Sequence, residues 1–295
     1  MHRAEVNMRD EQRFQTYLQK AEQGDADAQY QLGNCYYAGI GTVKDDEKAV
    51  YWYTKAAKQN HSKAQNDLGV SYQDGIGVNP NDKKAAYWFA KSANQGSPVG
   101  QTNLAACYYY GQGIEQDHEK AVYWYTKAAE QNDPTAQGLL GYCYHNGIGV
   151  AADVNKAVYW YTRSAEQGYA DAQFRLGLCC QEGIGVEQDI AKAVHLYSLA
   201  AIQNNSNAQY QLATCYQRGT GLPQNDKAAF ILFSKAAKQD HAEAQYQLSH
   251  CYRDGIGTEK DSVQSFYWFK KAAENGHPMA AFLLNLFTPD NKQSN

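Results

Sequence analysis

Apolar residues along the chain fall at helical spacing, in two short patterns that alternate. In the first pattern Ala28, Leu32 and Tyr36 recur at i, i+4 and i+8, which places them on one face of a helix. In the second pattern Ala49 and Tyr53 have the same spacing. Between the two patterns the chain is polar and rich in glycine. The sequence therefore predicts two short helices joined by a loop.

This helix pair returns every 36 residues without insertion or deletion. One column of the repeat is always glutamine: Gln29, Gln65, Gln101, Gln137, Gln173, Gln209 and Gln245. Another is always leucine: Leu32, Leu68, Leu104, Leu140, Leu176, Leu212, Leu248 and Leu284. A fixed period of this length is typical of one supersecondary unit stacked on copies of itself. We expect an all-α array of stacked two-helix repeats.

The helix ends carry capping residues. Asp25 begins a column of N-cap residues, in which we place the histidines as well: Ser97, Asp133, Asn205, His61, His241 and His277. The first helix ends at Gly39, and a glycine pair at positions 39 and 41 is present in every repeat. The second helix begins at Asp45, in a column that holds only Asp or Asn. These patterns indicate caps and tight turns rather than catalytic carboxylates or a phosphate loop.

Six of the seven cysteines share one repeat position: Cys35, Cys107, Cys143, Cys179, Cys215 and Cys251. Equivalent positions of stacked helices lie about 10 Å apart, beyond the roughly 7 Å Cα separation that a disulfide allows. A ladder of metal sites is the functional alternative. The pattern favours small side chains packed between helices in a reducing compartment. We predict no metal and no cofactor.

Charge and composition narrow the function further. The formal charge is −4 and the basic residues are scattered, so we expect no nucleic-acid partner. No apolar run approaches the roughly 20 residues of a membrane span, and the N-terminus does not resemble a secretory signal. We expect a cytoplasmic monomer, although delivery into a host cell by a non-classical route stays open. The internal histidines His145, His195 and His250 lie a repeat or more apart, so we expect no enzyme.

The repeat register divides the chain into a tail, a capping helix, seven repeats, a second capping helix and a disordered tail. In this order the ranges are 1–10, 11–24, 25–60, 61–96, 97–132, 133–168, 169–204, 205–240, 241–276, 277–287 and 288–295.

The text of one repeat, Leu140 to Ala165, reads L-G-x-x-Y-x-x-G-x-G-V-x-x-D-x-x-K-A-x-x-W-Y, then a basic residue and a small pair. It closely resembles the Sel-one-like repeats, a branch of the tetratricopeptide-like superfamily. The resemblance implies a right-handed α/α superhelix with a concave groove, acting as an adaptor or scaffold, for instance in signalling. One cysteine-rich branch pairs its cysteines within each repeat and has been linked to penicillin binding. The single cysteine per repeat departs from that branch, so a penicillin-binding or weakly β-lactamase-like protein is our alternative.

Partner binding is expected where the repeats differ. At 100° per residue, positions 30, 34 and 37 of the first helix point away from the face that carries Leu32. In the resembled superfamily this side lines the concave groove. It is rich in tyrosine, which is favoured at interfaces, although tyrosine is abundant here and these rings could only cover exposed backbone. The predicted residues for a protein or peptide partner are Tyr30, Asn34, Tyr37, Gln73, Tyr109, Tyr142, His145, Phe174, Leu178, Gln181, Tyr210, Tyr246, His250 and Arg253.

Overall fold

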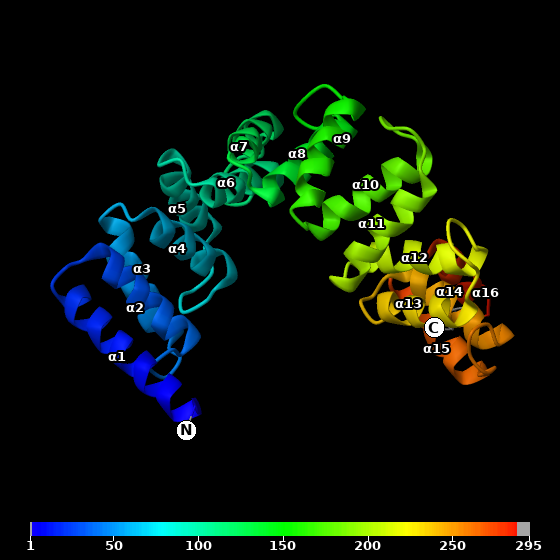
Figure 1. The fold of residues 1–295 in the computed structure, drawn as a ribbon, viewed down its shortest axis with the longest axis horizontal. Helices are drawn as coiled ribbons and strands as arrows, with labels where there is room; N and C mark the ends of the chain where they lie inside the picture. Colours follow the sequence, from blue (N-terminus) through cyan, green and yellow to red (C-terminus); the bar gives the residue numbers. More distant parts are fainter. Residues whose placement is uncertain (1, 288–295) are drawn as a thin grey trace, which may run out of the picture. The chain divides into compact units, whose positions relative to one another are not determined.

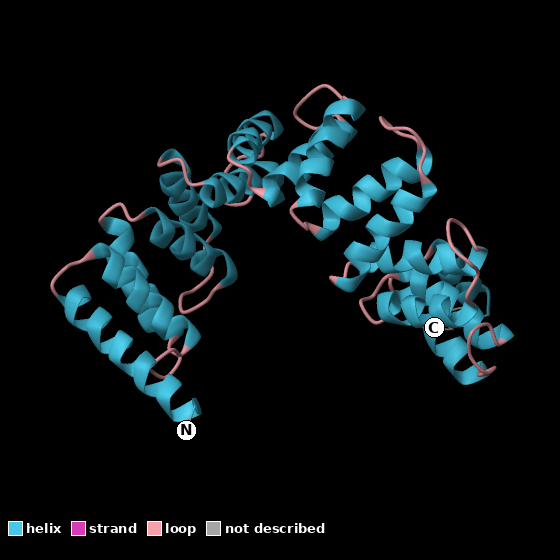
Figure 2. Ribbon diagram, viewed as in Figure 1, coloured by secondary structure: helices cyan, strands magenta, loops and turns pink. Residues whose placement is uncertain are grey.

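The computed structural model describes residues 2–287, and within this range the chain forms helices α1–α16 without a strand (Figures 1 and 2). The all-α class predicted from the repeat is confirmed. The tail predicted for residues 288–295 lies outside the described residues.

Each repeat supplies a first helix, the A-helix, and a second helix, the B-helix. The A-helices are α2 (Ala26–Ala38), α4 (Ser62–Asp74), α6 (Pro98–Tyr110), α8 (Pro134–Asn146), α10 (Ala170–Glu182), α12 (Ser206–Arg218) and α14 (Ala242–Asp254). The B-helices are α3 (Asp46–Lys58), α5 (Asp82–Asn94), α7 (His118–Glu130), α9 (Val154–Glu166), α11 (Ile190–Ile202), α13 (Asp226–Ala237) and α15 (Ser262–Glu274). The terminal helices are α1 (His2–Glu22) and α16 (Pro278–Phe287).

The helices group into two compact units, which divide in the loop between α8 and α9. Unit 1 holds α1–α8 and unit 2 holds α9–α16. Within each unit every helix packs on the next one along the chain, so an A-helix contacts the B-helix of its own repeat and that of the preceding repeat. Figure 1 shows this succession in chain order. Stacking of neighbours is what the repeat predicted.

The predicted caps are present. The Asp25 carboxylate accepts the Ala28 N–H at 2.7 Å, and the Nδ1 atom of His61 accepts the Ala64 N–H at 3.1 Å. At the other end of α2, Gly39 takes the left-handed conformation with φ 69°. The histidines of the N-cap column are therefore capping residues, as expected.

The second glycine of each loop has a separate reason. Gly77 has φ +67°, and a Cβ added there would collide with the carbonyl of Asp46, in the first turn of the preceding B-helix. The same close approach recurs along the chain, for example between Gly113 and the carbonyl of Asp82. The loop thus lies directly on the preceding repeat, which only glycine allows.

The glutamine column joins successive repeats. All seven glutamines are buried. The Gln65 amide donates to the Ala57 carbonyl in the preceding B-helix at 3.1 Å, and its carbonyl oxygen accepts the Gln95 amide of its own B-helix at 2.6 Å. Three helices are therefore tied together through one side chain. A buried polar group needs such partners.

The N-terminal boundary differs from the prediction. Residues 1–10 were expected to be a tail before a capping helix at 11–24, whereas α1 already begins at His2. Residues 2–22 contain neither glycine nor proline, so nothing in this stretch breaks the helix. The expectation that α1 replaces a B-helix fits the contacts, because a Cβ on Gly41 would meet the carbonyl of Asp10, as Gly77 meets that of Asp46.

The cysteines are packed as the column suggested. All seven are free and buried. Burial raises the pKa of Cys107 and Cys143 to about 11, so these thiols stay protonated at neutral pH.

Candidate functional site

The exposed A-helix face consists of positions 34 and 37 of each A-helix. Position 34 is half-buried in every repeat. At position 37, Tyr37, Gln73 and Arg253 are exposed, and the remaining residues are half-buried. This face therefore lies at the edge of the core, with position 37 the more open to solvent of the two.

Position 30 instead lies at the seam between repeats, which corrects the predicted orientation. Asn66 and Thr102 are only 8% and 7% exposed. Asn66 accepts the Asn103 amide of the next A-helix at 2.8 Å. The three tyrosines at this position stack on the N-cap histidine of the next A-helix or of α16, with ring centroids 4.6, 4.9 and 4.0 Å apart in Tyr30–His61, Tyr210–His241 and Tyr246–His277. Their main role is to fasten consecutive A-helices.

In unit 1, two predicted residues line a pocket. Asn34 and Tyr37 border a cavity of about 210 Å³ together with Tyr53, Asp67, Val70, Ser71 and Ile76. The Tyr53 hydroxyl donates to the Asn34 side chain at 2.8 Å. Burial, with a smaller contribution from Asp67, raises the pKa of Tyr53 above its usual range, so this hydroxyl remains a hydrogen-bond donor.

The other predicted residues of unit 1 lie further along the A-helices. Tyr109 packs its ring against Tyr110 and His118, with centroids 4.8 and 5.1 Å apart. Burial, and then Tyr142 of the next repeat, raise the pKa of Tyr109. His145 is half-buried at position 37.

In unit 2, Gln181 accepts the buried Tyr197 hydroxyl at 3.0 Å, and Phe174 lies 6.2 Å from the Tyr197 ring. Leu178, which lies on α10 between Phe174 and Gln181, is half-buried. These residues support the B-helix of their own repeat on one side while presenting the other side to solvent.

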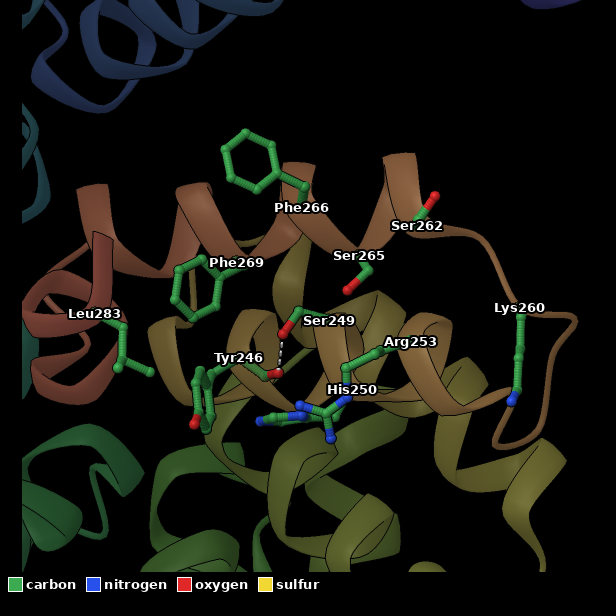
Figure 3. A pocket seen from close by; sticks show the side chains of 10 residues that line it. All are labelled: Tyr246, Ser249, His250, Arg253, Lys260, Ser262, Ser265, Phe266, Phe269 and Leu283. Carbon is green, nitrogen blue, oxygen red and sulfur yellow. Dashed lines mark hydrogen bonds between the residues drawn. The ribbon is translucent and has the colours of Figure 1, made fainter. Parts of the chain in front are cut away.

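The last repeat of unit 2 holds a cavity of about 510 Å³ (Figure 3). The three predicted residues of this repeat, Tyr246, His250 and Arg253, all line it. Burial, and then Arg253, lower the pKa of His250. Arg253 forms an exposed ion pair with Asp254 at 2.7 Å. The structure thus brings one position-30, one position-34 and one position-37 residue to a single opening.

A second exposed aromatic column went unrecognised in the sequence. Position 51 of the B-helix is not among the residues predicted to bind a partner, yet its tyrosines are about half exposed: Tyr51 52%, Tyr87 54%, Tyr123 54%, Tyr159 51% and Tyr267 49%. Each ring meets the edge of the tryptophan that follows it, as in Tyr51–Trp52 at 5.0 Å. The signal was available, because position 51 lies outside the i, i+4 spacing of Ala49 and Tyr53.

Two further kinds of site are absent from residues 2–287. There, no group of three His, Cys, Asp or Glu side chains gathers as metal ligands do. No described helix has both the length and the apolar character needed to cross a bilayer.

Capped helix pairs, stacked in chain order within each unit, define a helical-repeat protein. The sequence profile of the Sel1 repeat matches seven times, at residues 26–61, 62–97, 98–133, 134–169, 170–205, 206–241 and 242–277. The chain belongs to the Sel1 repeat family, and the resemblance noted in the sequence is confirmed. Proteins of this family are in general scaffolds for protein–protein interaction.

Solved structures agree with this assignment. The chain is 34% identical to c5321, a protective antigen of uropathogenic Escherichia coli with an SLR fold, at a TM-score of 0.76. That match covers 94% of this chain but only 59% of the E. coli protein. A Sel1 repeat protein from Oxalobacter formigenes is also 34% identical, with a TM-score of 0.72, over 93% of this chain and 79% of its own length. A search among curated proteins gave no match.

Proposed function

We propose that this protein is a non-enzymatic adaptor that binds a partner protein or peptide on the exposed A-helix face. The observation that carries the proposal is the coincidence of variable side chains with cavities. Asn34 and Tyr37 border the pocket of unit 1, and His250 and Arg253 border that of unit 2. Both cavities therefore include positions at which the repeats differ from one another.

The chemistry of this face suits protein binding. Tyr37 is 46% exposed, so a partner can bury much of its ring at little entropic cost. Amide and guanidinium groups at Gln73, Gln181 and Arg253 supply donors beside the aromatic surface. Interfaces combine such aromatic and arginine anchors with polar surroundings.

Affinity capture from a lysate of the native host tests the proposal with two matched variants. The test variant is Tyr37→Ala with Gln73→Ala, both on exposed A-helix positions. Tyr30 is left in place because it stacks on His61. The control is Tyr51→Ala with Tyr87→Ala, which removes exposed rings from the B-helices instead.

We expect a partner that the wild type and the control retain and the test variant loses, with equal helix content by circular dichroism in all three. Retention by the test variant and loss by the control would contradict the proposal and assign binding to the B-helices.

A further inference from the structure

The cavity in the last repeat forms where the other repeats have a closed core. At position 49 the other six repeats have alanine, none more than 2% exposed, whereas Ser265 is half-buried and lines the cavity. At position 53 the ring is buried in the other six repeats, whereas Phe269 is half-buried. In the last repeat these two core positions of the B-helix are therefore partly open to solvent, and one of them carries a hydroxyl group.

A second hydroxyl faces this opening from α14. Ser249 occupies position 33, where the other repeats have only glycine or alanine. In repeats with glycine, the ring at position 53 lies directly against this position, as Phe89 does against Gly69. Ser249 donates to the Tyr246 carbonyl at 2.7 Å, so its side chain occupies space near the ring rather than leaving it open. Figure 3 shows Ser265 on α15 above Ser249 on α14, with the Ser249 hydroxyl turned along its hydrogen bond.

One end of the cavity is basic. Arg253 of α14 and Lys260 of the following loop line it. The carboxylate of Asp254 lies beside them outside the lining, and Arg253 first, then His250 and Lys260, lower its pKa. Among the ion pairs of residues 2–287, none involves Lys260. Arg253 uses two of its five N–H donors on Asp254, and the two side chains are 58% and 43% exposed. The pair leaves the other three N–H donors of Arg253 for the carboxylate of a ligand.

The other end is apolar. Figure 3 shows Phe269 and Leu283 turned toward each other there, with Tyr246 beside them. The Tyr246 ring is held against His277 at 4.0 Å and lies 6.3 Å from Phe269. These side chains come from three helices, α14, α15 and α16. Stacking of Tyr246 on His277 fixes part of this wall before any ligand arrives.

We propose that this cavity binds a short acidic and apolar segment of a partner protein. A glutamate or aspartate of the segment meets Arg253 and Lys260, and an adjacent aromatic or aliphatic side chain packs on Phe269 and Leu283. At about 510 Å³ the cavity falls in the usual size range of ligand pockets, roughly 300–1,000 Å³. The inference rests on the proposed adaptor function and adds the chemical class of the partner.

Fluorescence polarisation on the full chain tests this class directly. The probe is a fluorescein-labelled peptide amide, Gly-Ser-Phe-Glu-Ser-Gly. Two matched peptides replace its glutamate by glutamine or its phenylalanine by alanine. We expect each replacement to weaken binding about tenfold, because the first removes a charge-assisted contact and the second an apolar one. Binding of the acidic peptide should also weaken as salt is raised.

Two protein variants locate the contact. Lys260→Gln should weaken binding of the acidic peptide about tenfold and leave the glutamine peptide unchanged. Lys227→Gln removes an exposed lysine of the same charge from α13 and should bind as the wild type does. Arg253→Gln repeats the test on the α14 side of the cavity. Any of three results would overturn the proposal. The acidic peptide does not bind, the acidic and glutamine peptides bind equally well, or Lys260→Gln binds the acidic peptide with unchanged affinity.

This outcome is separable from that of the adaptor function. A partner captured through Tyr37 and Gln73, together with no preference for the acidic peptide, would refute the ligand class and leave the adaptor function standing. Binding of the acidic peptide at Lys260, with no partner lost in the capture, would support the cavity and refute the wider binding face.

Discussion

Replacing Gln65 by methionine removes two hydrogen bonds between repeats while keeping the length of the side chain. Gln65 is 1% exposed, donates to the Ala57 carbonyl at 3.1 Å and accepts the Gln95 amide at 2.6 Å. Methionine fills a similar volume with a flexible chain, so the change adds little cavity or strain. The loss of stability should therefore report the hydrogen bonds.

The expected loss is about 2 kcal/mol, from two hydrogen bonds worth about 1 kcal/mol each. Neither former partner is left buried and unsatisfied. The Ala57 carbonyl still accepts the Asn60 N–H at 3.1 Å, and Gln95 is exposed, so its amide returns to water. The larger penalty of an orphaned buried group is therefore avoided.

Urea unfolding followed by circular dichroism measures this loss, and hydrogen exchange locates it. Because stacked repeats contact only their neighbours, amides of α3, α4 and α5 should lose protection first. Gln95→Ala is the comparison variant. It removes only one of the two bonds but leaves the buried Gln65 carbonyl oxygen without that partner, so it should cost about 1–3 kcal/mol. A double variant tests the coupling. Unchanged stability of Gln65→Met, or losses that add independently in the double variant, would refute the role assigned to the glutamine column.

Three further results are expected. Burial lowers the pKa of His241 below its ordinary 6.5, so the folded protein binds fewer protons than the unfolded chain and loses stability as pH falls below that value. The variant His241→Asn should therefore show a smaller drop in Tm between about pH 7.5 and about pH 5 than the wild type does. An equal drop would count against this role of His241. Gly77→Ala should lower the free energy of unfolding in urea by about 2 kcal/mol or more, because it adds a clash with Asp46 to a positive φ. Gly96→Ala, whose added Cβ meets nothing within 4 Å, should lower it by about half as much. Equal losses would show that the clash is relieved. Cys107, with its pKa raised to about 11, should react slowly with a thiol reagent until the chain is unfolded, and rapid native labelling would disprove its burial.

Features with a local cause could be predicted from the sequence. The caps at Asp25 and Asp45 and the left-handed turn at Gly39 depend on a few neighbouring residues, and all are present in the structure. Because the repeat occurs seven times, each of these local predictions applied to all seven copies. The start of α1 at His2 was missed because the prediction relied on the repeat, which has no copy before residue 11.

Contacts between repeats could not be predicted in the same way. Tyr30 stacks on His61, and Gln65 bonds both Ala57 and Gln95. These partners are distant in the sequence and their pairing depends on how one repeat is rotated on the next. Helical periodicity gave the correct exposure of position 37, but it could not show that position 30 lies against the neighbouring A-helix.

The central claim, that partners bind on the exposed A-helix face, is tested most directly by site-specific photo-cross-linking. A benzophenone amino acid replaces Tyr37 in one sample and Tyr51 in another, two tyrosines that are 46% and 52% exposed. Both samples are irradiated in a lysate of the native host, and cross-linked partners are identified by mass spectrometry. We expect a partner cross-linked from position 37 and absent from position 51. A partner cross-linked only from position 51 would place binding on the B-helices and contradict the account.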